Sequence, residues 1–233
     1  MLEFIHQLDQ IDTQIFLFFN GMHNSFWDYF MLIFSDRFVW VPFYVSFLFV
    51  MLKNFPAKVI FTTLAVIVLL IIFCDQTASG LLKPMIGRMR PSNLDNPISP
   101  MVHVVEGYRG GRYGFPSSHA ANAWGVAFFA RYLVRRSKLT FFLCIWACIT
   151  CYSRMYLGVH YFGDVLVGTL IGFIYATIYY YIFQHFLHKY TNEFKPTHHL
   201  RFSYVPILTG VISIWIIACA SGIMMMYGIH VRG

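Results

Sequence analysis

The chain has 233 residues, of which 58% are hydrophobic and only 12% are charged, and its mean hydropathy is +0.60. A water-soluble domain of this length cannot bury so large an apolar share, so the composition predicts an integral membrane protein. The formal net charge is +7, but the cations lie at the ends of apolar segments, as membrane topology requires, which argues against a nucleic-acid partner.

Residues 1–34 are apolar but are interrupted by polar side chains such as Asp9, Asp12 and Asn24. This pattern predicts one or two interfacial helices that lie along the membrane surface, with a further span as the alternative. Glu3 and Asp9 stand where a cleaved signal peptide would carry Lys or Arg, so no such peptide is expected.

The rest of the chain contains apolar segments of the length that crosses a membrane, which takes about 20 helical residues. We expect about six spans, the first of them short, over residues 38–52, 57–79, 116–134, 139–156, 161–187 and 202–227. The sequence has no internal repeat and no domain boundary. It therefore predicts one all-α domain over 1–233, a polytopic transmembrane helical bundle.

Three links between these spans are basic, and they are separated from one another by pairs of spans. Their cations are Lys53 and Lys58, then Arg131, Arg135, Arg136 and Lys138, and finally Lys189, Lys195 and Arg201. Links separated in this way lie on one side of the membrane, and the positive-inside trend makes that side the cytoplasm. Both termini and the loop 92–115 are then expected outside. Cations such as Arg88 and Arg109 depart from the trend there, which indicates a site for an anion.

The first segment of interest, Lys-Pro-Met-Ile-Gly-Arg-Met-Arg-Pro, runs over residues 83–91, just past the expected end of the second span. Lys83 offers a compact charge and Arg90 a planar fork, and both suit phosphate oxygens. Basic residues that flank a span also contact lipid headgroups, so this segment alone is weak evidence of a site.

The second segment, Gly-Phe-Pro-Ser-Ser-His over residues 114–119, opens the third span. With Pro116 at the first helical position, the N–H groups of Ser117, Ser118 and His119 would be free to bind an anion. The alternative is a helix start with no function, and this segment alone does not decide between the two.

The third segment runs from Ser153 to Asp164, between the fourth and fifth spans. His160 and Asp164 are four residues apart, so on a helix they share a face. A carboxylate bonded to one imidazole nitrogen fixes the tautomer and leaves the other nitrogen free to attack. A purely structural His–Asp pair is the alternative, although ionisable residues near a span favour function.

The predicted topology brings all three segments to the same outer end of the bundle. Together they supply the three cations Lys83, Arg90 and Arg154, a helix start, two histidines and one carboxylate. A metal centre would need more carboxylates or a tighter histidine cluster, so we expect no metal and no cofactor.

With these residues in place, the chain resembles the type 2 phosphatidic acid phosphatase superfamily, in its membrane lipid phosphatase branch. The signature of that family is K-x6-RP, PSGH and SR-x5-H-x3-D, and every spacing matches over a core of residues 83–164. The one departure is Ser118, where the family usually has Gly. Serine removes backbone freedom there and would crowd a phosphate slightly.

The resemblance implies a metal-independent hydrolase of phosphate esters or anhydrides, which acts through a phosphohistidine intermediate. His160 would attack phosphorus, Asp164 would hold and polarise His160, and His119 would protonate the leaving group and then activate water. The non-bridging oxygens would be bound by Lys83, Arg90, Ser117, Ser118 and Arg154.

The implied substrate is a lipid phosphate, and members of this size include phosphatases of undecaprenyl pyrophosphate, phosphatidylglycerol phosphate and lipid A. The loop 92–115, with Tyr108 and Arg109, is expected to help select among them. The implied location is a bacterial inner membrane with the site facing the periplasm. A non-catalytic lipid-binding protein and a transporter are the alternatives from other classes. Gly168 and Gly172 form a GxxxG pair, but tight helix packing explains it without a transport pathway.

Overall fold

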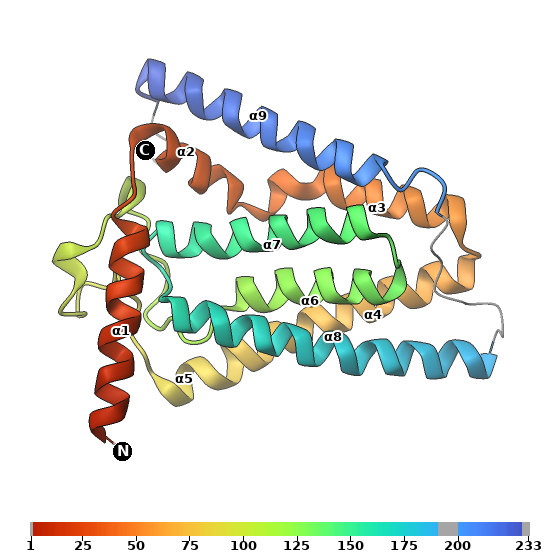
Figure 1. The fold of residues 1–233 in the computed structure, drawn as a ribbon, viewed down its shortest axis with the longest axis horizontal. Helices are drawn as coiled ribbons and strands as arrows, with labels where there is room; N and C mark the ends of the chain where they lie inside the picture. Colours follow the sequence, from red (N-terminus) through yellow and green to blue (C-terminus); the bar gives the residue numbers. More distant parts are fainter. Residues whose placement is uncertain (1, 191–199, 230–233) are drawn as a thin grey trace.

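The computed structural model describes residues 2–190 and 200–229, and the regular elements of these residues are all helical. Figure 1 shows long helices running side by side, with α1 lying across one end of them. This arrangement confirms the predicted all-α polytopic bundle. The helices are α1 Leu2–Asn20, α2 Ser25–Phe34, α3 Val41–Asn54, α4 Ala57–Asp75, α5 Lys83–Ile86, α6 Ser118–Leu133, α7 Ser137–Tyr156, α8 Phe162–Tyr190 and α9 Val205–Tyr227.

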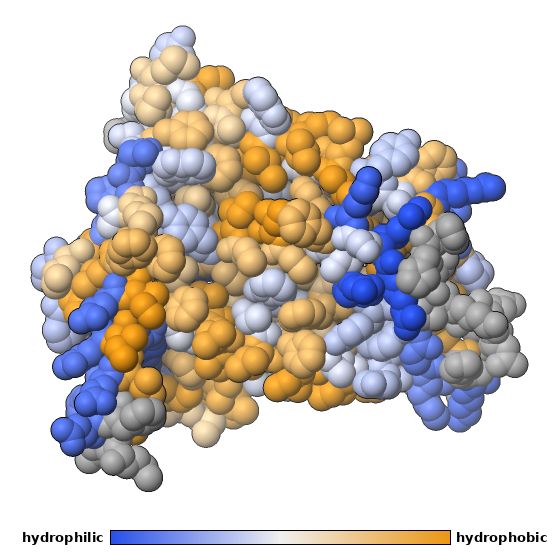
Figure 2. Space-filling view, viewed as in Figure 1, coloured by the Kyte–Doolittle hydropathy of each residue, from blue (hydrophilic) through white to orange (hydrophobic). Residues whose placement is uncertain are grey.

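Four continuous helical segments of the described residues are long and apolar enough to cross a membrane. A fifth candidate is the pair formed by α2 and the helical segment Arg37–Asn54, which bend by 67° at the break between them. Figure 2 shows a hydrophobic band over the middle of the molecule, with hydrophilic side chains gathered at its two ends. The four segments are Ala57–Ile86, Ser137–Tyr156, Phe162–Leu187 and Val205–Tyr227.

Helix α6 is the exception among the predicted spans, because its 16 residues extend only roughly 24 Å. It lies inside the bundle, where α4, α7 and α8 pack around it. The described residues of the three links predicted to share one side lie together at the end of the bundle opposite the loop 92–115, whereas residues 191–199, with Lys195, fall outside the described residues.

The N-terminal region is divided into two helices with different surroundings, whereas the sequence predicted one or two helices that both lie at the interface, with a further span as the alternative. Helix α1, which carries Asp9 and Asp12, crosses the ends of the other helices. Helix α2 is more apolar, packs against α9 and buries five side chains, so it is part of the bundle. The turn between them is held by Asn20, whose Nδ2 donates to the carbonyl of Tyr156 at 2.8 Å.

The second predicted span does not end at residue 79 but continues to Ile86. Helix α4 passes through a π-helical stretch, Gln76–Leu82, into α5, and Gly87 ends the helix with a φ of 65°. The left-handed conformation of Gly87 is one that glycine adopts without strain. Lys83 therefore lies inside the helix rather than beyond its end, and its Nζ donates to Ser79 Oγ at 3.0 Å.

The GxxxG pair marks the closest helix contact in this part of the bundle. A Cβ at Gly172 would lie 2.5 Å from the carbonyl oxygen of Ala121, and one at Gly168 would meet the carbonyl oxygen of Ser117. Only glycine lets α8 approach α6 this closely. The predicted packing role of the pair is thus confirmed, and it holds Ser117 against the start of α8.

Candidate active site

Backbone hydrogen bonds fold the loop 92–115 back so that the three motif segments become neighbours. Arg90 N donates to Arg112 O at 3.1 Å, and Gly114 N donates to Arg88 O at 2.9 Å. Ser92 N donates to Gly158 O at 3.0 Å, which joins the first segment to the third. The expected meeting of the three segments at one end of the bundle is therefore present.

His160 and Asp164 form a buried pair at the centre of this end. The imidazole Nδ1 lies 3.3 Å from Asp164 Oδ2, and the two residues are 1% and 0% exposed. They do not share a helix face as expected, because α8 begins at Phe162 and His160 lies in the turn before it. The contact arises because Asp164 Oδ2 accepts the backbone N–H of Tyr161 at 3.0 Å, which turns the chain back toward the imidazole.

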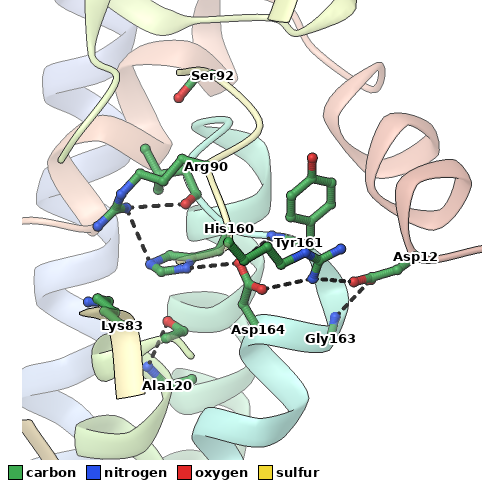
Figure 3. Close-up of polar contacts among 12 residues, drawn as sticks. Asp12, Lys83, Arg90, Ser92, Ala120, His160, Tyr161, Gly163 and Asp164 are labelled. Carbon is green, nitrogen blue, oxygen red and sulfur yellow. Dashed lines mark hydrogen bonds and ion pairs between the residues drawn. The ribbon is translucent and has the colours of Figure 1, made fainter. Parts of the chain in front are cut away.

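Two arginines from different segments surround the other side of the imidazole. Arg90 Nη1 lies 3.4 Å from His160 Nε2 and donates to the carbonyl of Val159 at 3.2 Å. Arg154 is 2% exposed, and its Nη2 donates to the hydroxyl of Tyr108 at 2.8 Å. Figure 3 shows Lys83 and Arg90 on the same side of His160. The Nε atoms of Arg90 and Arg154 are both buried without a hydrogen-bond partner among the described residues.

Buried donors without a hydrogen-bond partner are rare in proteins, so these two Nε–H groups are candidates for binding a ligand. Two guanidinium groups with spare N–H donors can hold the oxygens of a phosphate, since Arg matches that geometry with a planar fork. The described residues on this side of His160 supply no carboxylate that would neutralise the two guanidinium groups.

The protonation state of His160 suits a nucleophile. Burial, and then the charges of Arg90, Arg154 and Lys83, lower the pKa of His160 well below its ordinary value, and the backbone of Gly114 opposes this shift. The imidazole is therefore neutral near pH 7. With Nδ1 turned to Asp164, the lone pair of Nε2 points toward the arginines.

The start of α6 differs in detail from the prediction. Pro116 is not the first helical residue; Ser117 is the N-cap of a helix that begins at Ser118, because its Oγ accepts the N–H of Ala120 at 3.3 Å. The N–H of Ser117 donates to the carbonyl of Asp164 at 2.9 Å, so it is not free for an anion. Within the described residues the N–H groups of Ser118 and His119 have no acceptor, and the ring of His119 is exposed without a hydrogen bond.

Arg88 is a site residue that we did not predict. Its guanidinium contacts Asp164 Oδ1 at 3.0 Å, Asp12 Oδ2 at 2.7 Å and Asp9 Oδ1 at 2.7 Å, and it stacks on the ring of Tyr161. The signal for it was present in the sequence, because Asp9 and Asp12 are three apart in an apolar helix and so share a face. In the loop expected to help select the substrate, the hydroxyl of Tyr108 accepts from Arg154, and Arg109 donates to the carbonyl of Ser92.

No group of three His, Cys, Asp or Glu side chains within 2–190 and 200–229 is arranged to hold a metal ion. Metal independence of the reaction nevertheless stays a prediction.

Comparison with known proteins shows which family the chain belongs to. The PAP2 superfamily model matches residues 60–188. The chain is 48% identical to the lipid A 4′-phosphatase of Bacteroides thetaiotaomicron over 182 residues, 78% of this chain and 80% of the relative. It is 30% identical to the lipid A 4′-phosphatase of Porphyromonas gingivalis over 189 residues, 81% of this chain and 80% of that one.

A shorter match joins the chain to the phosphatidylglycerophosphatase B of Bacillus subtilis, with 31% identity over 117 residues, 46% of this chain and 52% of the relative. No solved structure matches the chain. The family match covers more than half of the chain and includes all three motif segments. The chain therefore belongs to the PAP2 superfamily, the type 2 phosphatidic acid phosphatases that its motifs resemble.

Proposed function

We propose that this protein removes the 4′-phosphate of lipid A through a covalent phosphate on His160, without a metal ion. Its family and its relatives make it a membrane lipid phosphatase. Lipid A is the substrate named for two relatives that match about four fifths of their own length, whereas the phosphatidylglycerophosphatase match covers about half. The single observation that carries the mechanism is the buried imidazole of His160, held between the carboxylate of Asp164 and the guanidinium of Arg90, whose Nε is buried without a partner among the described residues.

In the first step the Nε2 lone pair of His160 attacks phosphorus, and the bond from phosphorus to the sugar oxygen breaks. His119, which carries a proton when the phosphate dianion lies beside it, donates that proton to the oxygen, so the dephosphorylated lipid leaves as an alcohol. The exposed ring of His119, without a hydrogen bond to described residues, is available for this contact. Asp164 accepts from Nδ1 and stabilises the positive charge that develops on the imidazole.

In the second step His119 takes a proton from water, and the resulting hydroxide attacks phosphorus and releases inorganic phosphate and His160. In both steps the charge on the non-bridging oxygens is stabilised by Arg90, Arg154 and Lys83. The N–H groups of Ser118 and His119 at the start of α6 add two donors and the positive end of a helix dipole. Ser117 contributes only its hydroxyl, since its N–H is bonded to Asp164.

The test uses purified protein in detergent and a panel of lipids: lipid A, undecaprenyl pyrophosphate and phosphatidylglycerol phosphate. We expect phosphate release to be fastest from lipid A, and mass spectrometry of the product to show that the 4′-phosphate is lost and the 1-phosphate kept. His160→Ala is the matched control, with activity lower by several orders of magnitude, about a thousandfold or more. Faster turnover of another lipid would overturn the substrate, and near-normal activity of His160→Ala would overturn the mechanism.

We also propose that the protein lies in a bacterial inner membrane with the site facing the periplasm. The basic links at the opposite end of the bundle support this orientation through the positive-inside trend. In cells expressing a cysteine-free variant, a probe that cannot cross the membrane should label a cysteine placed near Asn96, at the exposed Leu94, but not one placed at the exposed Ser137. The reverse labelling pattern would place the site at the inner leaflet.

A further inference from the structure

Helix α1 is joined to the site through one carboxylate, that of Asp12. Its Oδ1 accepts the backbone N–H of Gly163 at 2.8 Å, and its Oδ2 accepts from Arg88 Nη1 at 2.7 Å. The fit is close, because a Cβ at Gly163 would lie 2.7 Å from Asp12 Oδ2. Asp12 therefore contacts both the first turn of α8, which carries Asp164, and the arginine that binds Asp164.

The same nitrogen of Arg88 that binds Asp12 also donates to Asp164 Oδ1 at 3.0 Å. The other oxygen of Asp164 faces His160 and the N–H of Tyr161. Figure 3 shows the resulting line of groups, with Asp12 on α1 at one end and His160 at the other. A continuous polar path thus runs from the helix that lies across the bundle to the imidazole.

The contacts of Arg88 and Asp12 keep the fully buried carboxylate of Asp164 paired and leave one of its oxygens for His160. Asp164 is 0% exposed, and a buried carboxylate stays ionised only when it is paired. A guanidinium free to turn would bind both of its oxygens, since fork-to-fork pairing is the favoured geometry, and would compete with the imidazole. With Arg88 drawn toward Asp12, one oxygen of Asp164 is left for His160.

We propose that Asp12 is a positioning residue that acts through Arg88 and Gly163 to keep Asp164 directed at His160. The proposal rests on the proposed role of the His160–Asp164 pair and adds to it a contribution from α1, which lies outside the matched family region. Asp12 itself touches neither substrate nor the reacting atoms.

The test compares Asp12→Asn with Asp9→Asn in the full-length protein in detergent. Both changes keep the shape and remove a charge facing Arg88, but Asp9 binds only Nη2, is 62% exposed and contacts neither Asp164 nor Gly163. We expect Asp12→Asn to lower kcat by about tenfold to a hundredfold, the usual effect of losing a charged hydrogen bond, with KM within about twofold. Asp9→Asn should lower kcat by less than about threefold.

A purely structural role would lower the melting temperature and the folded fraction while leaving the kcat of the folded protein unchanged. We therefore measure kcat per folded molecule, and we repeat Asp12→Asn in an Asp164→Asn background, where it should have no further effect. Equal kcat values for the Asp12 and Asp9 variants, a change in KM alone, or full additivity with Asp164→Asn would overturn the proposal. Activity remaining in His160→Ala would instead overturn the proposed function, so the two failures are distinguishable.

Discussion

His160 and Asp164 separate two regions of opposite character. On the α1 side of Asp164, Arg88 is surrounded by three carboxylates, those of Asp9, Asp12 and Asp164. On the far side of His160, Arg90 contacts a backbone carbonyl and the imidazole, and the charge that acts on it most strongly is that of a second cation, Arg154. Two arginines only two residues apart in the chain thus have opposite surroundings.

The pKa values of Arg88 and Arg90 are shifted in opposite directions by these surroundings. Burial by itself lowers the pKa of Arg88, but the carboxylates of Asp164, Asp12 and Asp9 outweigh it and raise the pKa. Burial, and then the charge of Arg154, lower the pKa of Arg90. The first region has its charges satisfied by the protein and serves to hold Asp164. The second has a surplus of positive charge, which a phosphate dianion would satisfy.

The largest expected effect comes from removing charge on the substrate side. Arg90→Gln should lower kcat/KM by about a hundredfold to a thousandfold, because it removes a donor aimed at the charge of the transition state. The control is Arg131→Gln, an exposed arginine in the last turn of α6 at the opposite end of the bundle. Phosphate release from lipid A by both variants checks this, and similar activities would show that Arg90 does not bind the transferred phosphate.

A smaller loss is expected where the two regions meet, at Gly114. A Cβ there would lie 3.0 Å from Asp164 Oδ2 and 3.3 Å from Arg90 Cγ, so Gly114→Ala should displace both groups and lower kcat by about tenfold to a hundredfold. Gly111→Ala is the matched control, because a Cβ at Gly111 meets nothing within 4 Å. If the two alanine variants have the same kcat, the close packing around Gly114 does not matter for turnover.

The cationic region also sets the titration of His160. Because burial and then Arg90 lower its pKa, His160 should stay neutral as the pH falls through 6.5, its ordinary pKa. In Arg90→Gln the pKa should rise, so the imidazole should gain its proton at a higher pH than in the wild type. NMR of histidine-labelled protein measures the pKa of His160 in the wild type and in Arg90→Gln. The signal of His160 is assigned by its loss in His160→Ala. An unchanged pKa in Arg90→Gln would contradict the coupling.

The smallest expected effect is that of chelation. Since the cations of the second region belong to the protein, turnover in excess EDTA should equal turnover in buffer, and vanadate should inhibit by resembling the transition state. Phosphate release with and without chelator is the measurement. Activity lost on chelation and restored by a divalent ion would show that a metal supplies the charge we assign to arginine and lysine.

The motif spacing and the alternation of spans predicted that the segments carrying Lys83, Arg90, Arg154 and His160 would meet, whereas the roles of these residues stay predictions. The first region depends on contacts between residues far apart in the chain, such as Arg88 with Asp12, which are 76 apart, and Asp12 with Gly163, which are 151 apart. Spacing within one segment shows that Asp9 and Asp12 share a helix face, but it does not show which cation they meet. Arg88 was therefore grouped with the other outer cations rather than with the site.

The sequence predicted the presence of the helices better than the residues at which they begin and end. Helix α4 passes the expected end at residue 79 because the π-helical stretch at Gln76–Leu82 keeps the backbone helical, and no hydropathy pattern marks such a stretch. Helix α6 begins at Ser118 rather than Pro116 because Ser117 serves as the N-cap. In the N-terminal region, α2 packs into the bundle because it is more apolar than α1. Helix α1 lies across the end of the bundle, where its acidic residues Asp9 and Asp12 pair with Arg88.

The central claim is that His160, between the two regions, carries the phosphate during turnover. The direct measurement is a rapid-quench reaction with lipid A labelled with radioactive phosphate at the 4′ position, stopped in base, where phosphohistidine survives, and mapped by peptide analysis. We predict that label appears on the peptide containing His160 before free phosphate accumulates, and that His160→Ala shows none. Release of free phosphate at the full rate with no label on His160 at any time would contradict the account.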